Sequence, residues 1–422
     1  MYLCIKILFN IYMRYKLFSL LMFLTSLNIS AQMFDDYFEN KTLRLDYIFA
    51  GDSKQQDIYL DELVQLPNWY GRKNHLSELP LQGNGQITVR NQKDRKVIYR
   101  HSFSSLFQEW LATPEAKQTR KSFENVFLVP FPKDTIEITV ELFDYHARIV
   151  STMTHIVSPT DILIRKPAGP STPYYIIKEP EDYDKCIHVA FVAEGYTETQ
   201  MTHFLEDCKT AMSAIFRHEP FKTLQNRFMI TAVCSVSDDS GVSEPGNNIW
   251  KSTALKTCFD TFYMTRYLTT LQIKNLHNVL AGTPYEHIII LANTEHYGGG
   301  GIYNSYNLSY TRGNKFEPVV VHEFGHSFGG LGDEYAYGDS DPYYFADTEP
   351  WEPNLTTLSD FASKWQDMMG KDPRVGLFEG AGYLPKGVYR PSNDCRMKTN
   401  EEPDFCPVCQ RALTRLIYFY TE

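Results

Sequence analysis

The chain has 422 residues and a formal net charge of -10, with 43% hydrophobic, 14% aromatic and 22% charged side chains. This length predicts two or three domains, and the composition excludes a disordered chain. The acidic charge and the lack of a basic run interleaved with aromatic residues exclude a nucleic-acid-binding protein.

The first predicted element is a secretory signal peptide. Within residues 13–32, the basic Arg14 and Lys16 precede a short apolar stretch and small residues that end at Ala31. The stretch is short for a membrane span, although an uncleaved anchor is the alternative. We predict a signal peptide over 1–31 and no transmembrane span after its cleavage. The protein would then be exported and remain periplasmic, sit at the cell surface or be secreted.

Residues 32–165 are predicted to form an antiparallel β-sandwich. Apolar residues alternate with polar ones in 42–51 and 135–144, which is typical of half-buried strands. Residues 86–100 predict a hairpin, and one helix is expected near 102–118. The segment contains no ionisable cluster with metal-binding or catalytic spacing.

A segment rich in proline and glycine, 165–173, marks the domain boundary. Beyond it, the continuous apolar strands 186–195, 227–236 and 287–293 alternate with predicted helices. One helix begins at a capping box, Thr197–Gln200, and another is expected around 265–282. This alternation predicts an α/β domain with a mainly parallel sheet over 174–422. The predicted fold class is therefore a two-domain α+β protein.

The stretch VVVHEFGHSFGGLGDEY, residues 319–335, carries the chemistry. A helix is expected over 317–326, with Gly329 or Gly330 at its left-handed C-cap. His322 and His326 are one turn apart on one face, so both imidazoles can reach one cation. Glu323 lies beside them as a general base, which completes the H-E-x-x-H pattern of zinc peptidases.

The alternative interpretation of this stretch is a buried structural helix. Three consecutive valines and Gly325 give it weak helix propensity, so it needs tertiary burial to form. Burying two histidines and a glutamate without a shared partner would be unfavourable. A single catalytic zinc ion removes that objection and favours the metal site.

The third zinc ligand is predicted to be Asp333. In the metzincin pattern the third ligand stands where this chain has Gly332, which cannot bind a metal. The extra glycine displaces the ligand by one residue. Glu334 is the rival, since two adjacent acids are not expected to point inward together. Asp339 and Asp341 are expected to be solvated loop acids, and Ca²⁺ binding by these acids is a lesser alternative without EF-hand spacing.

Met397, in a polar turn-rich segment, is predicted to form the methionine turn that metzincins place beneath the zinc. Some metzincins have a tyrosine two residues after this methionine to stabilise the transition state. Thr399 stands there in this chain, so Tyr335 or Tyr389 are candidate substitutes.

Seven cysteines remain after cleavage, an odd number that excludes complete disulfide pairing. Cys395 is expected to bridge to Cys406 or Cys409, because no further Cys or His follows to complete a four-ligand zinc site. The other four are expected to be inert thiols that lie in apolar surroundings: Cys186, Cys208, Cys234 and Cys258.

Four consecutive glycines, 298–301, follow the third apolar strand. Metzincins pair the extended substrate with an edge strand just before the zinc helix, and glycines let a second backbone approach closely. Gly299, Gly300 and Gly301 are therefore predicted to bind substrate, against the alternative of a flexible loop.

Together these stretches resemble the bacterial IgA-peptidase family of secreted zinc metallopeptidases. The resemblance rests on AFVAEGYTE, GGGGIYN, the zinc motif with its GDEY tail, and RPSNDCRM with FCPVC. It implies an N-terminal β domain before a metzincin-like catalytic domain, with His322, His326 and Asp333 as ligands and Glu323 as base.

The predicted function is an exported zinc-dependent endopeptidase. Its substrate would be a protein or peptide, with a host glycoprotein as one candidate. Immunoglobulin cleavage does not follow from the motif alone. The alternative hypothesis is a secreted glycoprotein- or glycan-binding protein with a structural or vestigial zinc site, and the intact Glu323 argues against it.

Overall fold

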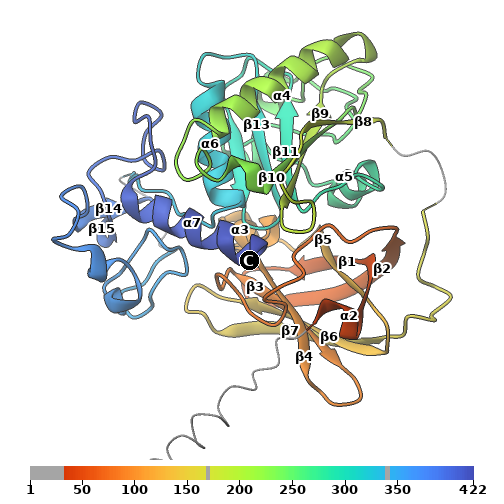
Figure 1. Cartoon of the computed structure of the whole chain (residues 1–422). Helices are drawn as coiled ribbons and strands as arrows, with labels where there is room; N and C mark the ends of the chain where they lie inside the picture. The colour runs from red at the N-terminus through yellow and green to blue at the C-terminus, as the bar shows by residue number, and fades with distance from the viewer. Residues whose placement is uncertain (1–32, 168–171, 338–342) are drawn as a thin grey trace, which may run out of the picture.

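A computed structural model describes residues 33–167, 172–337 and 343–422. The predicted signal peptide, part of the predicted boundary, and Asp339 and Asp341 lie outside the described residues. Among the helices within these ranges, none is long and apolar enough to cross a membrane. The chain is α+β, as predicted, with its N-terminal half below and its C-terminal half above in Figure 1.

The N-terminal half consists of two antiparallel sheets that share one hydrophobic core. The first sheet has the order β2-β1-β5, with bounds β1 Phe38–Gly51, β2 Gln56–Leu66 and β5 Lys121–Pro132. The second has the order β4-β3-β6-β7, with bounds β3 Gly85–Asn91, β4 Val97–Phe103, β6 Ile136–Phe143 and β7 Ile149–Val157. Two short helices accompany them, α2 Phe34–Tyr37 and α3 Leu106–Leu111.

The apolar alternation seen in the sequence creates this core. Along β1, Leu45 and Phe49 are fully buried, and they lie opposite Phe127 and Phe123 of β5. Burying such large side chains contributes about 1.5–3 kcal/mol each. The predicted helical interruption is α3, which begins after Ser105, whose hydroxyl accepts a hydrogen bond from a backbone N–H in the first turn.

The C-terminal half is built on a six-stranded sheet with the order β12-β13-β11-β9-β10-β8. Its four central strands are parallel and the two edge strands are antiparallel, in agreement with the predicted mainly parallel sheet. The bounds are β8 Tyr174–Lys178, β9 Ile187–Glu194, β10 Phe228–Val233, β11 His287–Ala292, β12 Gly299–Ile302 and β13 Tyr306–Tyr310.

Both faces of this sheet are buried, which explains its continuous apolar strands. On β9, Val189 and Phe191 pack into one core with the helices α4 Met201–Ile215, α6 Phe316–Ser327 and α7 Pro407–Thr421. Ala190 and Val192 point the other way, into the core shared with α5 Ile273–Val279 and the N-terminal sheets. A hairpin, β14 Phe378–Ala381 and β15 Leu384–Arg390, lies to the side of α7 (Figure 1).

The prediction of a helix around 265–282 is mostly wrong, because within this range only α5, Ile273–Val279, is helical. Thr270 ends the extended segment that precedes it, since its hydroxyl accepts a hydrogen bond from the backbone N–H of Gln272 at 3.0 Å. Upstream, Tyr267 forms a bridge with Gly299 of β12. Side chain–backbone hydrogen bonds of this kind compete with helix formation. The capping box at Thr197 is present as predicted and leads into α4.

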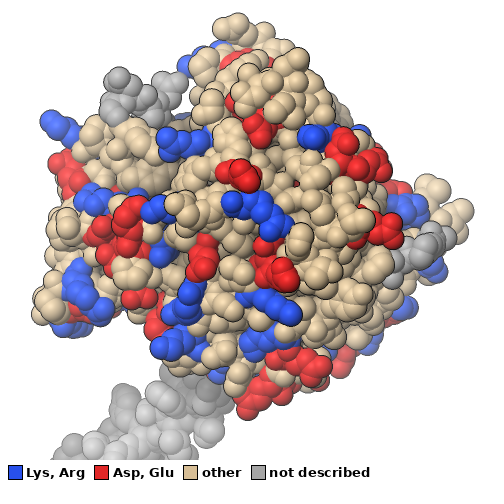
Figure 2. All heavy atoms as spheres, turned by 90° about the horizontal axis from the view of Figure 1, so that it is seen from above, with Lys and Arg blue, Asp and Glu red and all other residues tan. Residues whose placement is uncertain are grey.

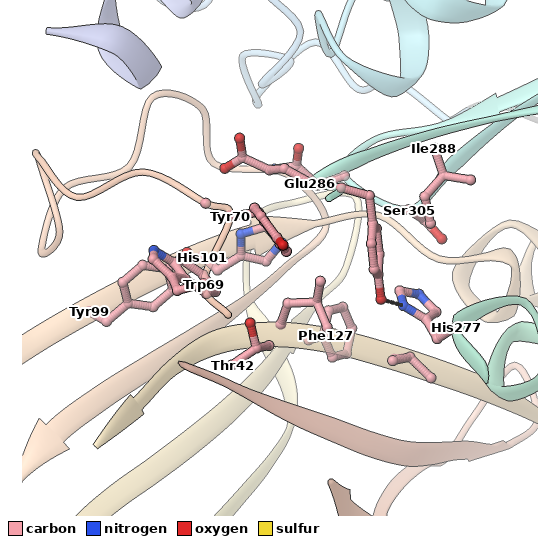
Figure 3. A pocket seen from close by; sticks show the side chains of 15 residues that line it. Thr42, Trp69, Tyr70, Tyr99, His101, Phe127, His277, Glu286, Ile288 and Ser305 are labelled. Atoms are coloured by element: carbon pink, nitrogen blue, oxygen red, sulfur yellow. Dashed lines mark hydrogen bonds between the residues drawn. The ribbon is translucent and has the colours of Figure 1, made fainter. Parts of the chain in front are cut away.

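The boundary between the two halves contains, beside the shared hydrophobic core, a polar contact and a cavity. Arg44 and Asp46 of β1 form a buried ion pair at 2.7 Å, and Arg44 also donates to the side chain of Asn278 in α5. Beside them lies a cavity of about 40 Å³, into which Phe127 enters from the first half and Glu286 from the second (Figure 3).

Charged side chains of both signs are interspersed over the face seen from above in Figure 2. That face shows no basic stripe.

Candidate metal centre

The end of α6 positions the first two candidate ligands. Gly330 has φ of +58°, a conformation that favours glycine, and it turns the chain back on the helix. This turn brings the carbonyl of Leu331 to the ring of His326, whose Nδ1 donates to it at 2.5 Å. Nδ1 of His322 donates to the carbonyl of Arg396 at 2.9 Å. With both Nδ1 atoms donating, the two Nε2 atoms are left with their lone pairs free.

These two nitrogens converge on Asp333, the predicted third ligand. Oδ1 of Asp333 lies 3.1 Å from Nε2 of His322 and 3.2 Å from Nε2 of His326, and the two nitrogens are 3.1 Å apart. Zinc–ligand distances of about 2.0–2.2 Å in a tetrahedron place ligands roughly 3.3–3.6 Å apart. The observed triangle is close to one face of such a tetrahedron.

The donor set fits a cation. When neither Nε2 carries a proton, Oδ1 of Asp333 is buried without a hydrogen-bond donor among the described residues, and both facing nitrogens are lone-pair acceptors. Three converging acceptors repel one another unless a proton or a metal ion lies between them. Two imidazoles and one carboxylate suit zinc, whereas Ca²⁺ takes oxygen ligands almost exclusively. The Ca²⁺ alternative involved Asp339 and Asp341, which lie outside the described residues, and stays untested.

Within the triangle, Asp333 favours a positive charge on His326, and the histidines favour a negative charge on Asp333. Burial alone would lower the pKa of His326, but the Asp333 carboxylate outweighs it and raises that pKa to about 9. Burial opposes the charged form of Asp333 as well, yet His326 and His322 hold its pKa well below the usual range. The Asp333 carboxylate is therefore ionised and ready to bind a cation.

Glu323, the predicted base, is on the same helix face and borders β12. A Cβ at Gly299 would lie 2.9 Å from Oε1 of Glu323, so the carboxylate rests directly over the edge strand. Burial raises the pKa of Glu323, and the Asp333 carboxylate adds to this rise, while His322 and His326 oppose it. A raised pKa makes the carboxylate a stronger base, which suits Glu323 to take a proton from a water molecule next to the metal ligands.

Met397 lies beneath the helix, where the sequence predicted a methionine turn. A Cβ at Gly325 would lie 2.6 Å from its Sδ, so glycine at this helix-interior position makes room for the methionine. The carbonyl of Arg396, the preceding residue, holds His322 as described above. The methionine segment thus touches the helix between its two histidines and orients one of them.

Asp333 is fixed by its neighbours. Tyr383, between β14 and β15, donates its hydroxyl to Oδ2, and the Gly382 N–H donates to the Asp333 backbone carbonyl at 2.9 Å. Tyr383 was missed in the sequence, because nothing in its local pattern links it to the zinc motif. Such partners orient a ligand and raise its basicity.

One prediction about the adjacent acid is wrong. Asp333 and Glu334 are both buried, with 7% and 0% of their surface exposed. On an extended segment successive side chains point to opposite sides, so each acid enters a different buried cluster. Glu334 does not compete for the histidines, because its carboxylate accepts from Cys409 Sγ at 3.2 Å.

The predicted disulfide is also wrong, since all seven cysteines in the described ranges are free. Sγ of Cys395 and Sγ of Cys409 are 3.9 Å apart, well beyond the roughly 2.05 Å of a disulfide. Cys406 lies in the same cluster, and Glu334 is its fourth member. Glu334 is not predicted from the sequence as a member of this cluster, because a fourth ligand was expected to be a Cys or His.

The glycines of β12 pack against the metal helix. A Cβ at Gly301 would lie 2.3 Å from the backbone carbonyl of Glu323, and one at Gly300 would lie 2.8 Å from the Tyr267 ring. The outer edge of β12 is bridged by Tyr267 at Gly299. The glycines therefore allow close approach of this chain's own elements, and substrate binding by Gly299, Gly300 and Gly301 stays a prediction.

The candidate transition-state residues differ in where they lie and in what they contact. The ring of Tyr335 lies 6.4 Å from that of His322, and burial together with the Asp333 carboxylate raises the pKa of its hydroxyl. Tyr389 belongs to β15, where its backbone pairs with Thr356, and the hydroxyl of Thr399 bonds to Asp394. Tyr335 is the candidate that borders the centre.

The N-terminal half also contributes to the wall of this site. Glu109 of α3 accepts a hydrogen bond from the Tyr267 hydroxyl. Burial raises the pKa of Glu109 to about 7, and the charges of His326, Glu323 and Asp333 act on it. The sequence offered no signal for this acid, because it lies far along the chain from the zinc motif.

The fold and the converging donors define an α+β protein with a metal-type centre at the end of a helix. Residues 176–374 and 370–417 match the family model described as IgA Peptidase M64, and residues 33–154 match the model described as Peptidase M64 N-terminus. The chain therefore belongs to the IgA peptidase M64 family, which confirms the resemblance and implies peptidase activity. None of the curated proteins matches the chain.

Proposed function

We propose that the chain is an exported zinc-dependent endopeptidase whose metal is held by His322, His326 and Asp333. The observation that carries this proposal is the triangle of ligand atoms, with sides of 3.1–3.2 Å, beside the carboxylate of Glu323. The side chains of His322 and His326 are 13% and 15% exposed, so the centre is accessible on one side. A catalytic zinc site needs such an open position.

The reaction assigned to the site is hydrolysis of a peptide bond. A bound zinc ion would act as a Lewis acid toward the scissile carbonyl and the attacking water. Glu323 takes a proton from that water and then delivers it to the leaving amine nitrogen. Its raised pKa favours the first transfer, in which it takes up the proton, and its position over β12 keeps it beside the histidines.

The arrangement of the elements around α6 supports this assignment. The sheet ends in the antiparallel edge strand β12, the metal helix α6 lies behind it, and Met397 packs against Gly325 of that helix. We place an extended protein or peptide substrate along β12, near Gly299–Gly301, with a host glycoprotein as a candidate. The segment around Tyr267 covers part of that edge and would limit the length of strand available for pairing.

Export is part of the proposal and rests on residues 13–32 alone. The basic start, the apolar stretch and the small residues before Ala31 are the support. N-terminal sequencing of the protein recovered from outside the cytoplasm should give Gln32 as the first residue. Recovery of the intact chain from the cytoplasm would contradict this part without affecting the site.

The proposed activity is tested by digesting a library of denatured proteins and mapping the new termini. Wild-type protein should cleave the library, lose activity with a chelator and regain it with zinc. Glu323→Ala should be inactive in the same assay. Unchanged cleavage by Glu323→Ala would contradict the proposed mechanism. No cleavage by zinc-loaded wild type, with glycoprotein binding by the same chain, would favour the binding-protein alternative.

A further inference from the structure

We infer that Glu334, Cys395, Cys406 and Cys409 form a second metal site, a closed structural zinc centre next to the proposed catalytic one. The inference concerns metal content and stability, so it does not depend on the proposed peptidase mechanism. One ligand atom from each of the four residues lies within 4.8 Å of the others, and all four residues are buried. Four ligands without an open position are the hallmark of a structural zinc site.

The distances within the cluster suit zinc. Zinc–sulfur distances of about 2.3 Å in a tetrahedron place two sulfur atoms roughly 3.8 Å apart. Sγ of Cys395 and Sγ of Cys409 are 3.9 Å apart, and Sγ of Cys409 is 3.2 Å from Oε1 of Glu334. Small shifts of these side chains would complete the coordination.

The carboxylate of Glu334 is the second, independent observation. Oε2 of Glu334 is buried and has no hydrogen-bond donor among the described residues, while Oε1 is held by Asn354 Nδ2 at 2.9 Å. The residue as a whole is 0% exposed. A buried carboxylate that is oriented on one oxygen and unpartnered on the other needs a cation. The hydrogen bond from Asn354 is the kind of partner that fixes a metal ligand.

The backbone around the cluster favours thiolates. The N–H groups of Cys406 and Met397 point at Sγ of Cys395, at 3.2 and 3.5 Å. Cys406 is the N-cap of α7 and Cys409 lies in its first turn. The positive end of a helix stabilises negative charge, and thiolates are the form in which cysteine binds zinc. These groups offset the excess negative charge of three thiolates and one carboxylate around a divalent ion.

The main competitor is a disulfide in an oxidising compartment. A disulfide would use two of the three cysteines and leave the third beside a buried Glu334 without a cation. A metal ion instead satisfies all four residues at once. The cysteine spacing agrees, since Cys406 and Cys409 form a C-x-x-C pair at a helix start, and Cys395 and Glu334 come from two separate loops.

The second site would fix the first one in place. Glu334 follows Asp333 directly, and its N–H donates to the Met397 carbonyl at 2.8 Å. Cys395 precedes Arg396, whose carbonyl accepts from His322. A metal bound to Glu334 and Cys395 would therefore tie together the loop that carries Asp333 and the methionine turn.

The test measures zinc and thiols in the purified full chain. Wild-type protein should contain close to two zinc ions per chain, and the His326→Ala variant close to one. Titration of wild type with an organomercurial, followed by a colorimetric zinc indicator, should release one zinc as the three clustered thiols react. The same titration of His326→Ala should still release its remaining zinc.

The matched variants are Cys409→Ala and Cys234→Ala, which remove two buried thiols from the same half of the chain. Cys409→Ala should lose one zinc, whereas Cys234→Ala should keep both. If Cys409→Ala does not fold, Glu334→Gln and the wild-type titration carry the test. The inference is overturned if mercurial releases no zinc from wild type, or if mass spectrometry of the unreduced chain finds two clustered cysteines joined by a disulfide.

Discussion

The open centre, formed by His322, His326 and Asp333, differs in its access to solvent from the closed cluster of Glu334 and three cysteines. His322 and His326 keep 13% and 15% of their side chains exposed, whereas Glu334, Cys395 and Cys409 are completely buried. An open position is what a reaction needs, and a closed shell is what a structural brace needs. Exposure, more than the presence of metal-type ligands, therefore separates the centre suited to catalysis from the one suited to holding the fold.

The two clusters are also linked through the dipeptide Asp333–Glu334. Because neighbouring side chains on an extended backbone alternate in direction, one peptide segment serves both clusters. The Glu334 N–H donates a hydrogen bond to the Met397 carbonyl, and the Asp333 carboxylate lies against the ring of His322. A change at one acid should therefore affect a different property from a change at the other.

Removal of Asp333 is expected to have the largest effect on activity. Asp333→Ala takes away one of three ligands of the open centre, so kcat/KM on a cleaved peptide should fall by more than about 100-fold. The free energy of unfolding should change far less than the activity. Asp367→Ala, at an exposed acid paired with Arg411, is the control and should retain activity. Comparable activity in both variants would mean that Asp333 is not a ligand.

Removal of the Tyr383 hydroxyl should weaken the open centre without destroying it. Tyr383→Phe loses the hydrogen bond to Oδ2 of Asp333, and loss of such a partner costs about 10–100-fold in metal affinity. Competition with a zinc chelator measures the affinity. Tyr337→Phe, at an exposed tyrosine, is the matched control and should bind zinc as wild type does. Equal affinities in the two variants would show that Tyr383 does not position the ligand.

Gly325→Ala should destabilise the helix that carries the open centre. The added methyl group would meet Sδ of Met397 at 2.6 Å, and such overpacking costs about 1–3 kcal/mol, against a gain of up to about 1 kcal/mol in helix propensity. Urea unfolding should show a net loss of stability. The cost should shrink when Met397→Ala is present, which a double-mutant cycle measures. Additive effects would mean that the two side chains do not meet.

Glu286 provides a comparison with a half-buried acid that lines a cavity and lies outside both clusters. Burial raises its pKa to about 8 from an ordinary value of 4.5, although Arg72 opposes the rise. Between these pH values the folded chain binds a proton that the unfolded chain has released, so stability falls as the pH rises from about 4.5 to about 8. The cavity beside it can admit water (Figure 3), which limits the effect to on the order of 1–3 kcal/mol.

Glu286→Gln should reduce that decline when the free energy of unfolding is followed by urea titration from about pH 5 to about pH 8. Glu181→Gln, at an exposed acid, should leave it unchanged. A wild-type stability that rises over this range, together with a flat Glu286→Gln profile, would contradict the assignment of Glu286.

Much of the fold could be predicted from local pattern. The alternation in β6, the hairpin β3–β4 and the capping box before α4 all depend on neighbouring residues, and the structure contains each of them. In β1 the predicted half-buried pattern is lost over residues 42–47, which are all buried, because Arg44 also packs against α5 of the other half. The prediction of a helix around 265–282 failed because Thr270 and the bridge from Tyr267 to β12 impose an extended chain. Tertiary contacts overrode propensity there.

In the candidate site too, some residues could be predicted from local sequence and others depend on distant contacts. His322, Glu323 and His326 follow from helix geometry, and Asp333 from a displaced motif. Glu334 and Tyr383 depend on contacts between segments distant in sequence, which no spacing rule shows. Glu109 requires packing of one half of the chain on the other.

The measurement that tests the central claim most directly is anomalous diffraction at the zinc edge from a crystal of the full chain. The account predicts a peak within bonding distance of Nε2 of His322, Nε2 of His326 and Oδ1 of Asp333, with Glu323 beside it but not bound. A peak that is bound by the two histidines and a residue other than Asp333, or no peak at the histidines of zinc-loaded protein, would contradict it.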